Sequence, residues 1–137
     1  MNLIIRPYEE EYFNQIEALN KAEEWYNLVV HSGLTKRAWE NSTVAYVALD
    51  NDVLIGYVRG LTDANITLYV CELLIHAEYR NQSIGSKLLN YVHNKYPTTR
   101  MELLASSSSY TYYEQKNSDP FMDIEKHLMN KGARNKG

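Results

Sequence analysis

The chain has 137 residues, a formal net charge of −3 and 45% hydrophobic residues, which is the size and composition of one globular domain with a hydrophobic core. The negative net charge argues against a general nucleic-acid-binding surface. No apolar run approaches the roughly 20 residues of a membrane-spanning helix, and the first residues lack the features of a signal peptide. The single cysteine, Cys71, cannot form a disulfide within the chain. We therefore expect a cytoplasmic protein that binds neither nucleic acid nor a membrane.

The first forty residues predict one strand and two helices. Residues 3–5 form a short apolar run that proline ends, which is typical of a strand. From residue 8 to about residue 21, apolar side chains recur every three or four positions, as on one face of an amphipathic helix. A second, shorter helix is predicted over residues 35–40, with Thr35 or Ser32 as its cap.

The middle of the chain has the pattern of strands. Residues 43–49, 53–60 and 66–75 are strand-like runs separated by aspartate and asparagine residues that favour turns. These three runs predict an antiparallel meander. A helix follows that Ser83 is expected to cap, and its buried stripe is predicted to consist of Ile84, Leu88, Leu89 and Val92.

The last third predicts a strand at residues 101–105, a helix that opens at residues 106–109, and a final strand at residues 121–128. The element order βααβββαβαβ indicates an α+β or mixed α/β fold around a central, mostly antiparallel twisted sheet. No linker divides the chain. We therefore expect a single domain over residues 1–128 and a flexible tail over residues 129–137.

The connection from the third meander strand to the next helix has a composition suited to binding an anion. Ser83, Gly85 and Ser86 are small, so a ligand can approach the backbone closely. The first turn of the helix presents unpaired N–H groups at the positive end of the helix dipole, and Arg80 adds a positive charge. This pattern suits a pyrophosphate group, although an ordinary tight connection has the same composition.

This segment resembles the acetyl-CoA-binding motif of the GNAT family of N-acetyltransferases. The family motif has Arg or Gln, two variable residues, Gly, one variable residue, and then Gly or Ala. Here it reads Arg80-Asn81-Gln82-Ser83-Ile84-Gly85, with Ser83 at the position of the first glycine. Serine fits there if its backbone angles are helical. The resemblance extends over nearly the whole chain and includes the run from Val53 to Gly60.

The resemblance implies that acetyl-CoA is the co-substrate and that the protein binds it along the strand and loop. A backbone N–H near Leu74 or Ile75 would polarise the thioester carbonyl. The residues implied to bind acetyl-CoA are Leu73, Leu74, Ile75, Arg80, Asn81, Gln82, Ser83, Ile84, Gly85 and Ser86.

Two residues are candidates for proton transfer. The resemblance aligns Tyr113 with the tyrosine that protonates the departing CoA thiolate; the alternative is an aromatic anchor of the last helix. Glu72 is a carboxylate in a mainly apolar strand, so it is our candidate for the base that deprotonates the amine. The alternative is an ion pair with an arginine such as Arg59. A covalent route through Cys71 is less favoured than direct attack, because a lone strand cysteine is usually a buried apolar residue.

The acceptor is expected to be the primary amine of a small molecule. In the family, the segment between the first two helices walls the acceptor site, and here it contains Trp25 and Tyr26 beside two glutamates. Aromatic rings and carboxylates suit a cation, although the glutamates also fit a solvated helix end and the aromatics a core. Asp63 could face the same cleft. The four histidines are scattered without the spacing of metal ligands, so we expect no metal.

The prediction is therefore an N-acetyltransferase that moves the acetyl group of acetyl-CoA to an amine by direct attack. The alternative is a non-catalytic CoA-binding or interaction module of the same fold. A homodimer that pairs through an exposed edge strand is a further expectation.

Overall fold

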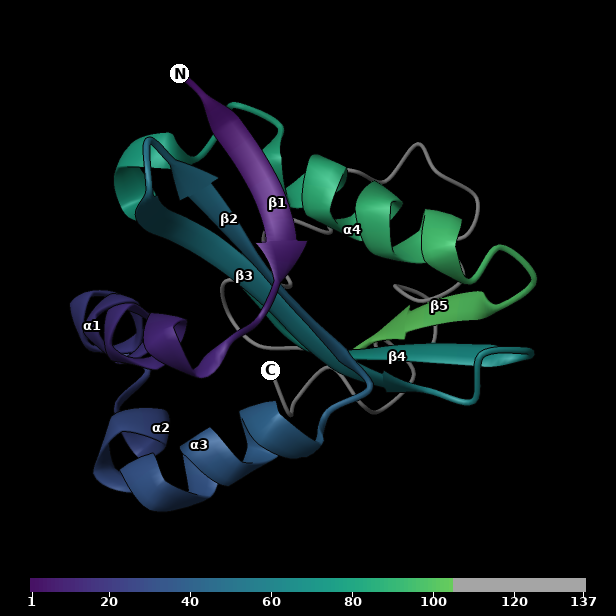
Figure 1. Ribbon diagram of the computed structural model, residues 1–137, viewed down its shortest axis with the longest axis horizontal. Helices are drawn as coiled ribbons and strands as arrows, with labels where there is room; N and C mark the ends of the chain where they lie inside the picture. Colours follow the sequence, from purple (N-terminus) through teal and green to yellow (C-terminus); the bar gives the residue numbers. More distant parts are fainter. Residues whose placement is uncertain (105–137) are drawn as a thin grey trace, which may run out of the picture.

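The computed structural model describes residues 1–104 and shows a five-stranded sheet between two layers of helices (Figure 1). The strands lie in the order β1-β2-β3-β4-β5; the pairs β1–β2, β2–β3 and β3–β4 are antiparallel, and β4–β5 is parallel. The strands are β1 (Leu3–Pro7), β2 (Val44–Asp50), β3 (Val53–Thr62), β4 (Thr67–Ile75) and β5 (Arg100–Leu103). The helices are η1 (Glu10–Tyr12), α1 (Phe13–Ala22), α2 (Tyr26–Val30), α3 (Ser32–Asn41), η2 (Ala77–Tyr79) and α4 (Ile84–Lys95). The predicted fold class and the meander are confirmed.

The sheet has a hydrophobic core on each face. On one face, α4 packs against the sheet, and its predicted stripe of Ile84, Leu88, Leu89 and Val92 is confirmed, since each is at most 2% exposed. On the other face lie α1 and α3, which bury Ile16 and Trp39 against Tyr57 and Leu74. Figure 1 shows α1, α2 and α3 on one side of the sheet and α4 on the other. The two cores hold every strand of the meander from both sides.

The helices before β2 differ from the sequence prediction. The helix α2 was not predicted, and α3 begins at Ser32 rather than at Thr35. Neither predicted residue caps α3, because the cap position is His31 and no side chain bonds there. Thr35 is instead buried within the helix, and its hydroxyl donates to the carbonyl oxygens of Leu28 and His31, at 2.7 and 3.0 Å. That hydroxyl joins α2 to α3, a contact that no local pattern encodes.

A β-bulge bends the pairing of β3 with β4. Arg59 pairs with Glu72 and the next residue, Gly60, pairs with Val70, so Cys71 has no partner in the register. Beyond the bulge, β5 pairs with β4 over Thr67–Val70. The bulge therefore divides β4 into a half that pairs with β5 and a half that continues towards the start of α4.

We expect Gly60→Ala to destabilise the fold, because a Cβ on Gly60 would lie 2.3 Å from the carbonyl oxygen of Tyr69 and 3.1 Å from the Cα of Val70. Both neighbours are backbone atoms and cannot move aside cheaply, so the expected loss is about 1–3 kcal/mol in the free energy of unfolding. Urea denaturation measures it.

The matched control is Gly33→Ala in α3, where the nearest neighbour of a Cβ is the tip of Arg37, at 3.9 Å. This change should leave stability unchanged or raise it by up to about 1 kcal/mol, because alanine favours helix more than glycine does. Equal losses in the two variants would contradict the assigned bulge.

Candidate functional site

The loop between β4 and α4 has an unusual backbone. Asn81 and Ser83 are both left-handed, with φ of 66° and 65°. Asparagine tolerates this conformation, whereas serine carries a steric cost there. The condition that Ser83 be helical is therefore not met. Its left-handed backbone gives the physical reason for a glycine at this motif position.

The start of α4 lacks the predicted side-chain cap. Ser83 occupies the cap position, but its side chain makes no capping hydrogen bond, which corrects the predicted cap. The N–H groups of Ile84 and Gly85 lie in this first turn, where a helix has no carbonyl acceptors of its own. Asn81, Gln82 and Ser83 are exposed in front of them. A loop with left-handed residues directly before a helix start is a type of backbone that binds phosphate oxygens in proteins.

Arg80 is held in place by contacts with β4 and with the residue that follows α1. Its Nε donates to the carbonyl oxygen of Ile75 at 3.1 Å, and its guanidinium forms an ion pair with Glu23. The same carboxylate accepts from the N–H of Ala77, at 3.2 Å. The Glu23 side chain is only 12% exposed, so the alternative that Glu23 belongs to a solvated helix end is wrong. It fixes the loop to the end of α1.

The predicted strand residues offer backbone rather than side chains to a ligand. Leu73 and Leu74 are buried on opposite faces of the sheet, in the α4 core and the α1 core respectively. Ile75 is half-buried, and Ile84 is 1% exposed and anchors the start of α4. These side chains hold the strand and the loop in place and belong to the two cores.

Glu72 pairs with Arg59, as the alternative interpretation of Glu72 anticipated. The Arg59 Nε and Nη2 lie 3.0 and 3.1 Å from the two carboxylate oxygens, and Nη1 donates to the Ser42 hydroxyl at 3.0 Å. The two side chains are 16% and 14% exposed. Burial lowers the pKa of Arg59, but the hydrogen bond and charge of Glu72 outweigh it and raise the pKa overall. The pair is thus a firm, largely buried ionic contact.

Cys71 lies beside this pair and is half-buried. Burial raises the pKa of its thiol; the charge of Glu72 adds to the rise, and that of Arg59 opposes it. A thiol that resists ionisation is a poor nucleophile near neutral pH. A raised thiol pKa argues against an acetyl-cysteine intermediate.

The three predicted acceptor residues separate into two places. Trp25 packs half-buried against the α1 core in the connection from α1 to α2, and Tyr26, the first residue of α2, is 54% exposed. Asp63 lies in the β3–β4 turn, where its Oδ1 accepts from the N–H groups of Asn65, Ile66 and Thr67. That turn is at the other end of β4 from the loop, about 26 Å along the strand. The turn itself was predicted from its aspartate and asparagine, and such an aspartate commonly bonds the backbone of its own turn.

Among residues 1–104, no group of three or more histidine, cysteine, aspartate or glutamate side chains is placed to hold a metal ion. In the same range, no helix combines the length and hydropathy needed to span a membrane. Tyr113, the helix through residue 113, the strand at 121–128 and the tail lie outside the described residues.

Comparison with known proteins agrees with this architecture. The family model described as the acetyltransferase (GNAT) family matches residues 5–122. Because this match covers most of the chain, the protein belongs to the GNAT family of acetyltransferases. No curated protein matches the sequence.

Several solved structures share the fold at low sequence identity. A GNAT-family acetyltransferase from Streptococcus pneumoniae has a TM-score of 0.67 and 22% identity, with 84% of this chain and 86% of that chain covered. The PaiA N-acetyltransferase from Thermoplasma acidophilum, in complex with coenzyme A, has a TM-score of 0.61 and 15% identity over 85% and 89% of the two chains. AAC(6')-Iy, in complex with the bisubstrate analogue CoA-S-monomethyl-acetylneamine, has a TM-score of 0.67 and 12% identity over 86% and 88%.

Replacing Ser83 by glycine should stabilise the protein, because glycine adopts a φ of 65° without the steric cost that serine bears. We expect a gain of about 0.5–1 kcal/mol in the free energy of unfolding. The matched control is Lys87→Gly, one turn into α4, which should lose about 0.5–1 kcal/mol. Denaturant titration of both variants measures the difference, and a loss of stability in Ser83→Gly would contradict the left-handed assignment.

Proposed function

We propose that this protein transfers the acetyl group of acetyl-CoA to the primary amine of a small molecule by direct attack. Membership of the GNAT family supports acetyl transfer. The observation that carries the cofactor assignment is the start of α4, where Asn81 and Ser83 are left-handed and the Ser83 side chain at the cap position makes no capping hydrogen bond. A diphosphate suits such a site, since it offers several acceptor oxygens to backbone N–H groups.

The residues present fit acetyl-CoA. The N–H groups of Ile84 and Gly85 would hold the diphosphate, with the Arg80 guanidinium, whose side chain is 43% exposed, adding positive charge beside it. The inner half of β4, from Leu73 to Ile75, would orient the pantetheine arm through main-chain groups. When bound, acetyl-CoA supplies an activated thioester. Coenzyme A is present in the related structures of PaiA and of an aminoglycoside 6'-N-acetyltransferase, which supports the same ligand class here.

The amine would enter beside the connection that carries Trp25 and Tyr26. Tyr26 is 54% exposed and Trp25 is partly so, and aromatic faces attract an ammonium group before it loses its proton. Asp63 takes no part in this proposal, because its carboxylate is bound within a distant turn. The bisubstrate analogue bound to AAC(6')-Iy supports a small acceptor.

Glu72 and Tyr113 are the proposed proton-transfer residues. Glu72 would take the amine proton, directly or through a water molecule; its oxygens accept from Arg59, and each retains a further lone pair. The amine nitrogen then forms a bond to the carbonyl carbon as the carbon–sulfur bond breaks. Tyr113 would donate its proton to the departing thiolate, as in the family motif it matches. Positioning of the two substrates supplies much of the acceleration.

A non-catalytic CoA-binding module is the second candidate. It is favoured by Ser83, which replaces the motif glycine and places a side chain in front of the helix start. With either function we propose a cytoplasmic protein with a single domain over residues 1–128 and a tail over residues 129–137. We also propose a homodimer, because β1 forms one edge of the described sheet and a second copy could pair there.

The central test compares binding with turnover. Acetyl-CoA at about 100 times its dissociation constant should stabilise the fold by about 2.7 kcal/mol, which a thermal shift detects. A panel of polyamines, aminoglycosides and short peptides, assayed for free CoA with a thiol reagent, should identify acceptors. Tyr113→Phe should keep the thermal shift and lose at least about ten-fold in turnover. A thermal shift without turnover on any amine supports the module; no shift refutes both candidates.

A second pair of variants separates the two interpretations of Glu72. Glu72→Gln and Arg59→Gln both break the ion pair, so each should cost about 1–3 kcal/mol of stability. Only Glu72→Gln removes the proposed base and should lower kcat about 100-fold or more, with little change in the KM for acetyl-CoA. Steady-state kinetics with the best acceptor measures this. Equal losses of kcat in the two variants would assign Glu72 a structural role.

A further inference from the structure

The last turn of α1 ends in a defined backbone motif. The Trp25 N–H donates to the Asn20 carbonyl oxygen at 2.8 Å. The Glu24 N–H donates to the Lys21 carbonyl oxygen at 3.2 Å, and Glu24 is left-handed, with φ of 65°. These bonds and this backbone form a Schellman motif, in which glycine usually occupies the left-handed position. The backbone that carries Glu23 is therefore fixed by hydrogen bonds in which its side chain takes no part.

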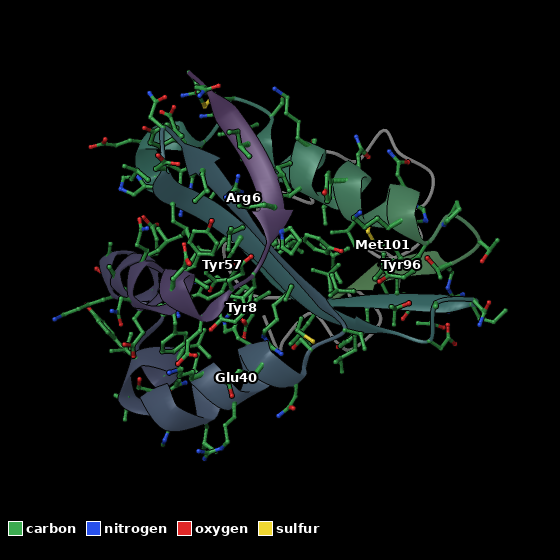
Figure 2. All side chains as sticks on the ribbon, in the orientation of Figure 1. Arg6, Tyr8, Glu40, Tyr57, Tyr96 and Met101 are labelled. Atoms are coloured by element: carbon green, nitrogen blue, oxygen red, sulfur yellow. The ribbon has the colours of Figure 1, made fainter. Side chains whose placement is uncertain are left out.

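A buried hydrogen bond joins this helix end to the sheet. The Tyr57 hydroxyl on β3 donates to the side-chain oxygen of Asn20 in α1, and both residues are fully buried. Figure 2 shows Tyr57 between β3 and α1. Trp25 also packs against this core. Movement of the helix end would break these contacts, so α1 supports Glu23 rigidly.

From this support the Glu23 carboxylate reaches the loop before α4. Its Oε2 accepts from the N–H of Ala77 at 3.2 Å, and its Oε1 pairs with the Arg80 guanidinium. Ala77 is the first residue of η2, so its N–H has no acceptor within that helix. The carboxylate thus holds both ends of residues 77–80, directly before the left-handed Asn81.

Arg80 is fixed by two contacts and retains further donors. Its Nε donates to the Ile75 carbonyl oxygen at 3.1 Å, and its Nη2 donates to Glu23. A guanidinium carries five N–H groups, and this side chain is 43% exposed. The remaining N–H groups can therefore donate to a phosphate while both contacts persist.

We propose that Glu23 is a positioning residue for acetyl-CoA, which holds Arg80 and the start of η2 in place before the cofactor binds. The role rests on the proposed function, in which the loop before α4 binds the diphosphate. An unrestrained arginine loses rotamer freedom when it binds a phosphate, and this loss weakens binding. In the free protein the Glu23 contacts have already restrained Arg80, so the loss on binding is smaller.

The opposite role for Glu23 is that of an internal anion, which competes with the diphosphate for Arg80. Two substitutions separate the roles, because one alters reach and the other alters charge. Glu23→Asp keeps the charge, but its side chain is shorter by a methylene group and cannot span from the fixed helix end to both partners. Glu23→Gln keeps the length and an acceptor oxygen and removes the charge.

The test measures the dissociation constant of coenzyme A by isothermal titration calorimetry, at a temperature where each variant is folded. Glu23→Asp should weaken binding about five-fold, the factor that corresponds to one restrained side chain. Glu23→Gln should stay within about two-fold of the wild type, because its amide oxygen still accepts from Arg80 or Ala77. A contact that serves stability alone would change the melting temperature and leave both dissociation constants unchanged.

Two controls localise the effect. Glu10→Gln removes a carboxylate that pairs with Lys36 at 2.7 Å, in η1 and outside the loop, and should leave the dissociation constant unchanged. Pantetheine, which lacks the diphosphate, should bind the wild type and Glu23→Asp equally well. Titration followed by NMR measures pantetheine binding, because it covers weak dissociation constants.

Wild-type protein that binds no coenzyme A overturns the proposed function and the role of Glu23 together. With normal wild-type binding, four patterns overturn the role of Glu23 alone. Equal affinity of both Glu23 variants and the wild type makes the contact purely structural. Binding by Glu23→Gln that is more than about two-fold tighter than the wild type identifies a competing anion. Weaker binding by Glu23→Gln than by Glu23→Asp makes charge the decisive property. An equal loss of pantetheine binding places the effect on β4 instead of the diphosphate.

Discussion

The bulge between β3 and β4 determines where every side chain of the inner half of β4 points. Side chains normally alternate along a strand, but the unpaired Cys71 shifts that alternation by one. Val70 and Leu73 consequently both pack in the α4 core, while Leu74 packs in the α1 core. The shift also places Glu72 opposite Arg59. Without it, the Glu72 side chain would point into the hydrophobic core beneath α4, where burial of a charge is costly.

Much of the fold could be predicted from local patterns. The aspartate and asparagine residues between β2 and β3 fit left-handed turn positions, and Asn51 and Asp52 indeed have positive φ. The apolar stripe of α4 follows a period that only a helix satisfies. Small residues and a positive charge at the start of a helix are a local signal for an anion, and the resemblance to the GNAT motif made this loop the proposed site of the cofactor.

Other features depend on contacts between residues far apart in the chain, which no local pattern contains. The carboxylate of Glu23 meets the N–H of Ala77 across 54 positions of sequence, and Thr35 is fixed by a carbonyl of the preceding helix. The short helix α2 has five residues, too few for a period to appear. The backbone of Ser83 is left-handed against the preference of its own side chain, so surrounding structure overrides local propensity there. Tyr113 matches the family motif in sequence alone, since it lies outside the described residues.

The contact between Glu23 and the loop has a thermodynamic consequence. One carboxylate joins the segment that precedes Trp25 to the guanidinium of Arg80 and to the main chain of Ala77. Linkage between two ligands is reciprocal whenever each of them alters the same contact. If an acceptor shifts the end of α1, it changes the affinity for the nucleotide by the same factor by which the nucleotide changes the affinity for the acceptor. The size of the coupling between the two substrates would then depend on a single side chain that touches neither reacting atom.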